Sequence, residues 1–151
     1  MYPAQEPNYN FLNQYVQVIE QILNDIGIPV QEARHTSQRG YGWHITKGSA
    51  LIEIYLNEQA NRGYFQVVSP LIHIPASGLL PLYRRLLELN LQIANAALGI
   101  YLDVVYIYHE RPVEGLNLNE VNEIITSIAV YADDLDNQLV EEFGGRLYSS
   151  V

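Results

Sequence analysis

The chain has 151 residues, a common length for one domain, and its hydrophobic fraction of 48% is typical of a folded globular protein. Its net charge of −9 argues against nucleic-acid binding, which depends on clustered Lys and Arg, and its lack of cysteine excludes disulfides and thiolate chemistry. We find neither the pattern of a secretory signal nor an apolar stretch long enough to span a membrane. We therefore expect a single cytoplasmic domain over residues 1–151, with a flexible leader at 1–9 and a flexible tail at 146–151.

The first predicted element is an amphipathic helix over residues 11–26. Apolar side chains recur there at spacings of three and four, which place them on one face of a helix. Asn8 or Asn10 can cap its start. Gly27 ends it, because glycine readily takes the left-handed conformation that follows a helix.

Three strands are predicted next, over residues 41–45, 50–56 and 64–68, where β-branched and aromatic residues are frequent. The turn-like segments 47–49 and 57–63 separate them, so two antiparallel hairpins are the simplest arrangement. A fourth piece, residues 71–74, lies between Pro70 and Pro75. Because proline cannot donate a ladder hydrogen bond, this piece is predicted as a sheet edge or a connector.

The second half of the chain begins with another amphipathic helix, which follows Ser77 and tolerates Pro81 in its first turn. Residues 100–109 are apolar and rich in β-formers. They are compatible with one long strand or with a hairpin that turns near Leu102 and Asp103, and both readings stay open.

The closing helix has the clearest signals. Asn117 and Glu120 have the spacing of a capping box, and an apolar stripe then runs from residue 121 to residue 143. Gly144 and Gly145 end it. The predicted fold class is therefore α+β, an antiparallel sheet of about five strands with helices mainly on one face, in the order α-β-β-β-α-β-β-α.

The sequence contains no recognisable catalytic or metal-binding motif. The four histidines are far apart in sequence and form no metal-binding pair, and no nucleophile elbow is present. The segment 40–42 precedes a strand, whereas a phosphate-binding glycine loop follows one. Nine acids lie between residues 110 and 142, where a solvated helix face explains them. We expect no catalytic residue, no cofactor and no metal.

Large aromatic side chains on the predicted strands are the most distinctive feature. Because alternate residues of a strand share a face, Tyr41 and Trp43 can project from one surface of the sheet, as can Tyr106 and Tyr108. Exposed Tyr and Trp are typical of protein contacts, although tyrosines can also simply cover a solvated sheet. The candidate contact surface comprises Tyr41, Trp43, Tyr101, Tyr106 and Tyr108.

Two further expectations concern partners. Leu82, Leu86 and Leu89 form one stripe of the second helix, which serves either as core or as a homodimer contact. The functional hypothesis is a non-catalytic protein-binding module, a chaperone-like or regulatory adaptor that acts as a homodimer. The alternatives are a small-ligand protein or enzyme with a pocket between sheet and helices, and a surface that serves only self-association.

Two segments carry a resemblance to a known family. Residues 86–90 (LLELN) end the second predicted helix, and residues 112–116 (PVEGL) form a turn before the closing helix. With the strand region between them, they resemble the YbjN family of bacterial proteins, whose fold is similar to that of type III secretion chaperones. The resemblance covers most of the chain, up to Gly144. It implies an acidic homodimer that holds an extended segment of a client protein against its sheet and helices.

Overall fold

The computed structural model describes residues 12–37 and 40–148. The elements in chain order are α1 (Asn13–Asp25), α2 (Val30–Ala33), β1 (Arg34–Ser37), β2 (Gly40–Lys47), β3 (Ala50–Gln59), β4 (Arg62–His73), α3 (Leu79–Asn90), β5 (Ala97–Tyr101), β6 (Val104–Pro112), α4 (Leu118–Phe143) and β7 (Arg146–Leu147). The predicted α+β class with an antiparallel sheet is confirmed. In the described residues, however, the sheet has seven strands where about five were predicted.

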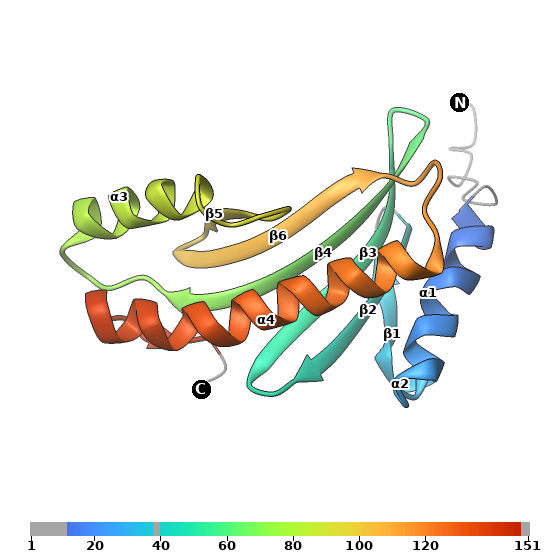
Figure 1. Ribbon diagram of the computed structural model, residues 1–151, viewed down its shortest axis with the longest axis horizontal. Coiled ribbons are helices and arrows are strands. Elements are labelled where there is room, and N and C mark those ends of the chain that lie inside the picture. Colours follow the sequence, from blue (N-terminus) through green and yellow to red (C-terminus); the bar gives the residue numbers. More distant parts are fainter. Residues whose placement is uncertain (1–11, 38–39, 149–151) are drawn as a thin grey trace, which may run out of the picture.

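The sheet is antiparallel throughout, in the order β1-β2-β3-β4-β6-β5, with β7 added to the end of β4. Figure 1 shows α4 running along one face of the sheet, α1 crossing that face at one end, and α3 lying beside β5. Fully buried side chains fill the space under the helices: Ile52, Ile54, Phe65, Val67, Val105 and Ile107. We call the sheet face under α1 and α4 the covered face, and the opposite face the open face.

The N-terminal region differs from the prediction in two respects. A short helix, α2, and a short edge strand, β1, lie between the first predicted helix and the first predicted strand, where no element was predicted. The end of α1 follows the prediction, since Gly27 has a φ of 80°. The caps proposed at Asn8 and Asn10 lie outside the described residues.

β4 corrects the prediction of two separate pieces. It is one strand of 12 residues, and Pro70 lies inside it. The register against β6 shifts between Pro70 and Ile72, so the proline occupies a β-bulge where no ladder hydrogen bond is required. β4 is therefore the central strand that joins β3 to β6.

Residues 100–109 form a hairpin, which resolves the alternative left open by the sequence. β5 pairs with β6 from Ala97 to Tyr101, and the turn consists of Leu102 and Asp103. Both turn residues have positive φ, at 45° and 63°, the combination of a type I′ turn that matches the twist of the two strands. The geometry is reached without glycine.

The end of the chain combines a confirmed element with a corrected one. The Asn117 side chain accepts a hydrogen bond from the backbone N–H of Glu120 at 3.0 Å, as the capping pattern predicts. Residues 146–148 belong to the segment expected to be a flexible tail, but β7 pairs with β4 and the Tyr148 N–H donates to the Leu71 carbonyl. None of the helices in the described ranges is long and apolar enough to cross a membrane.

Candidate functional site

On the open face, the strand register determines which side chains lie next to each other. Glu53 of β3 is directly opposite Val68 of β4, which in turn is opposite Tyr108 of β6. One step along, Tyr55 is opposite Gln66, which is opposite Glu110. Directly opposite residues have Cβ atoms about 5 Å apart, so these side chains form two adjoining rows.

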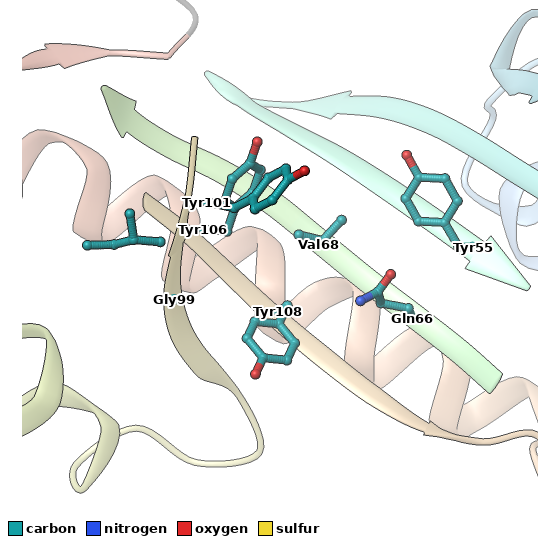
Figure 2. Close-up of a pocket in the computed structure, with 8 residues that line it drawn as sticks. Tyr55, Gln66, Val68, Gly99, Tyr101, Tyr106 and Tyr108 are labelled. Carbon is teal, nitrogen blue, oxygen red and sulfur yellow. The ribbon is translucent and has the colours of Figure 1, made fainter. Parts of the chain in front are cut away.

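A groove of about 610 Å³ opens on this face. Four tyrosines dominate the lining, which comprises Tyr55, Gln66, Val68, Gly99, Ile100, Tyr101, Tyr106 and Tyr108. Figure 2 shows Gln66 and Val68 between Tyr55 and Tyr108, with Tyr101 and Tyr106 next to each other. The two β4 residues thus form a floor between aromatic walls.

Glycine at position 99 keeps one side of the groove open. Gly99 is directly opposite Tyr106, on the open face. A Cβ atom built there would lie 3.7 Å from Cε1 of Tyr108, an ordinary van der Waals contact. A larger side chain is therefore compatible with the backbone, but it would project into the groove.

The tyrosines bring both apolar area and hydroxyl groups. Tyr101 is 67% exposed and Tyr108 is 37% exposed, while Tyr55 and Tyr106 are half-buried. The hydroxyl of Tyr55 donates to Oε2 of Glu53 at 3.2 Å. Burial, together with the nearby Glu53 carboxylate, raises the pKa of Tyr55 to about 12, and burial likewise raises the pKa of Tyr106. Both phenols are therefore neutral at physiological pH.

The groove has the chemistry that a contact surface would need. Tyrosine rings supply large apolar area with little conformational freedom to lose, and their hydroxyls remain available for hydrogen bonds at the rim. The lining residues comprise tyrosine, glutamine and apolar side chains, without a base beside a nucleophile. Within the described ranges no group of three or more His, Asp or Glu residues is placed to hold a metal ion.

The predicted contact surface is corrected at two positions. Tyr41 and Trp43 lie on the covered face, opposite Leu56 and Ile54 in the register, whereas Tyr106 lies on the open face. Trp43 is fully buried, and its Nε1 donates to Glu20 of α1 at 3.3 Å. The hydroxyl of Tyr41 donates to Asn13 of α1 at 2.8 Å. Both aromatics serve to dock α1 on the sheet.

For the leucine stripe of the second helix, the structure selects the core alternative over the dimer contact. Leu82, Leu86 and Leu89 are buried in the core and leave no surface for a partner. A different set of side chains is exposed on α3 and at its C-cap, with Leu80 at 81%, Leu87 at 69% and Leu91 at 92%. Together with Tyr83, Arg84 and Glu88 they line a shallow apolar groove of about 380 Å³, which we call the α3 stripe.

Parity along the strands was enough to pair Tyr106 with Tyr108 on one face. It gave no indication that Gln66, Val68 and Gly99 complete the groove. These three residues converge only through the register of β4, β6 and β5, and no sequence signal marks them.

Comparisons with known proteins agree with this architecture. The crystal structure of the ExsC–ExsE complex contains a chain with a TM-score of 0.63 and 12% identity, covering 84% of this chain and 94% of that one. The HopA1–SchA chaperone–effector complex contains a chain with a TM-score of 0.65 and 11% identity, covering 87% of this chain and 99% of that one. At such low identity these likenesses concern the fold. No curated protein matches the sequence.

A family model matches residues 13–150, nearly the whole of the chain. It is described as T3SS (YopN, CesT) and YbjN peptide-binding chaperone 1. The match confirms the resemblance read from residues 86–90 and 112–116. The chain belongs to the TY-Chap1 family of type III secretion and YbjN peptide-binding chaperones.

Proposed function

We propose that this protein is a non-catalytic chaperone or adaptor that holds an extended segment of a client protein in the tyrosine groove of its open face. The observation that carries the proposal is a groove of about 610 Å³ walled by four tyrosines on a sheet face that the helices leave uncovered. Grooves lined by aromatic rings hold extended peptides through apolar contact, while hydroxyls and amides at the rim fix their position. The similar fold in a chaperone–effector complex supports this reading.

A pocket between sheet and helices is the less favoured arrangement. The covered face is packed with fully buried side chains such as Trp43, Phe65 and Ile107, whereas the tyrosine groove lies on the opposite face.

We also propose a cytoplasmic location for the protein, on the basis of its sequence.

The test uses peptides selected on the purified protein from a random display library and then measured by fluorescence anisotropy. We expect the double variant Tyr106→Ser/Tyr108→Ser to weaken binding by at least about tenfold, since buried tyrosines are frequent hot spots. Gly99→Val should weaken it as well, because the added side chain projects into the groove. Tyr64→Ser is the matched control: Tyr64 lies on the same face under Arg62 and does not line the groove. Equal affinities in all four proteins would contradict the proposal.

We further propose that the protein self-associates through the α3 stripe. Arg84 and Glu88 flank the exposed leucines and pair with each other at 2.8 Å. In an antiparallel arrangement of two α3 helices about a two-fold axis, Arg84 of one copy faces Glu88 of the other, so the stripe is complementary to itself in charge as well as in apolarity. The occupant that we assign to the stripe is therefore a second copy of the chain.

Sedimentation equilibrium tests the dimer. Leu87→Glu should shift the protein to the monomer, because it places a carboxylate at the centre of the contact. Val130→Glu is the control, since Val130 is a 52% exposed apolar residue on α4, away from the stripe. A dimer unaffected by Leu87→Glu, or a wild-type monomer at high concentration, would exclude this interface.

A further inference from the structure

We infer that the client segment carries basic side chains, and that Glu53 and Glu110 receive them on either side of the groove floor. The ligand class is an extended peptide in which Arg or Lys flanks an apolar or aromatic residue. This inference rests on the proposed function, because it assigns a chemistry to the occupant of the same groove.

The carboxylates of Glu53 and Glu110 are placed beside the groove floor by the strand register. Glu53 is the direct neighbour of Val68 in the register, and Glu110 is the direct neighbour of Gln66. Val68 and Gln66 are the β4 residues of the floor. The two acids therefore border the floor on opposite sides, one on β3 and the other on β6.

Their spacing fits an extended peptide. Glu53 and Glu110 are two strand spacings apart across the sheet and two residues apart along it, which places their Cα atoms about 12 Å from each other. In an extended chain, residues four apart are separated by about 13 Å and point to the same side. A peptide with basic residues at positions 1 and 5 can thus reach both carboxylates while residue 3 lies among the tyrosines.

The arginine ion pairs of the described ranges do not involve either carboxylate. Five arginines in the described ranges form ion pairs with other carboxylates: Arg34 with Glu20, Arg62 with Glu114, Arg84 with Glu88, Arg85 with Glu142 and Arg111 with Glu120. Within the described ranges, no basic group lies within ion-pair distance of Glu53 or Glu110. The carboxylates beside the groove floor therefore have no arginine partner in the described ranges. The basic side chain placed beside them by the register is His44 of β2, directly opposite Glu53.

The tyrosines strengthen this preference for a cation. The Tyr55 hydroxyl donates to Glu53 and so holds the carboxylate beside the groove. Because the phenols of Tyr55 and Tyr106 are neutral, their rings present electron-rich faces without adding charge. Cations bind such faces favourably, so a basic side chain gains from the rings as well as from the carboxylates.

The experiment compares three synthetic peptides of equal length by fluorescence anisotropy. They share a Phe at position 3 and differ only at positions 1 and 5, which are Arg, Gln or Glu. We expect wild-type protein to bind the Arg peptide about tenfold more tightly than the Gln peptide, the Glu peptide to bind weakest, and the differences to shrink as salt is raised. In Glu53→Gln/Glu110→Gln the Arg and Gln peptides should bind equally.

Control variants separate the local effect from the overall charge. Glu123→Gln/Glu141→Gln removes the same number of charges from the exposed face of α4 and should retain the preference for Arg. Tyr106→Ser/Tyr108→Ser should weaken the binding of all three peptides. Equal binding of the Arg and Gln peptides by wild-type protein would overturn the inference, as would an Arg preference that persists in Glu53→Gln/Glu110→Gln. If binding is also insensitive to the tyrosine variant, or if no peptide binds at millimolar concentration, the proposed groove function fails with it.

Discussion

The side chain of Asn90 forms hydrogen bonds with both backbone polar groups of Leu98, across the free edge of the sheet. Its Nδ2 donates to the Leu98 carbonyl at 3.3 Å, and its Oδ1 accepts from the Leu98 N–H at 2.7 Å. β5 is the last strand of the sheet, so these groups would otherwise face an unpaired edge. The amide at the end of α3 thus takes the place of a neighbouring strand and joins the helix to the sheet.

Asn90→Ala should destabilise the protein. It removes both hydrogen bonds and leaves a half-buried backbone donor and acceptor without a partner, which costs about 1–3 kcal/mol. Urea unfolding measures the loss, and the Leu98 amide should exchange with solvent faster. The control Gln92→Ala, at an exposed position just beyond α3, should change stability by no more than about 0.5 kcal/mol. Equal stabilities of the two variants would show that the amide contacts contribute little.

Arg111 supports the corner between β6 and α4. Its Nε donates to the Pro112 carbonyl at 2.7 Å, its Nη2 donates to the Glu114 carbonyl, and its Nη1 pairs with Glu120 in the first turn of α4. We expect Arg111→Ala to lower the free energy of unfolding by about 1–3 kcal/mol, because hydrogen bonds from a charged, partly buried donor are the stronger kind. Arg84→Ala, which removes an exposed helical ion pair, should cost no more than about 0.5 kcal/mol in the same thermal and urea measurements.

Tyr55 should make the protein sensitive to alkali. Its pKa is raised from 10.0 to about 12, mainly by burial and by the Glu53 carboxylate. A raised pKa in the folded state contributes stability that is complete below pH 10 and is lost as the pH rises through 12. Tyr55→Phe should remove this part of the alkaline dependence, which unfolding measurements between pH 9 and the alkaline end point will reveal. The prediction would be contradicted if the ultraviolet absorbance of Tyr55 showed ionisation at the ordinary tyrosine pKa of 10.0.

Asp136 should make the protein less stable as the pH rises, whereas most carboxylates make a folded protein more stable as the pH rises. It is 5% exposed on α4, and burial raises its pKa, with the Asp133 charge adding to the effect and the Asn137 N–H opposing it. The ionised form therefore disfavours folding, so the stability associated with this group falls as the pH rises from 3.8 through the raised pKa. Asp136→Asn should stabilise the protein at neutral pH and lose that advantage in acid. The measurement is the difference in free energy of unfolding between the two proteins at pH 4 and pH 7; a constant difference would refute the assignment.

Local chemistry was sufficient to predict some elements and misleading for others. The start of α4 follows from Asn117 and Glu120 alone, because a cap is made within one turn. Pro70 suggested an interruption of the strand, whereas the bulge allows β4 to continue past it; only the pairing with β6 creates that bulge. The Leu102–Asp103 turn has no glycine signal, and its left-handed backbone is imposed by the two strands that it joins.

The candidate site shows the same division. The parity of Tyr106 and Tyr108 predicts a shared face, and the structure places both in the groove. Parity does not tell which face α1 covers, so it predicts Trp43 as a contact residue, whereas Trp43 is fully buried and bonded to Glu20 of α1. The lack of an arginine partner at Glu53 and Glu110 depends on the three-dimensional structure, in which the five paired arginines of the described ranges contact other carboxylates.

The pairing of β7 with the end of β4 has a consequence for the timing of folding. β3 accompanies β4 as far as Val68, and the stretch beyond it gains its second neighbour only from Leu147 and Arg146. These contacts join residues more than seventy positions apart in the sequence, so closing them is slow relative to the local hairpins. During synthesis, the tip of β4 must wait until residues 146 and 147 have left the ribosome, and until then it presents a vacant edge to chaperones or to other nascent chains.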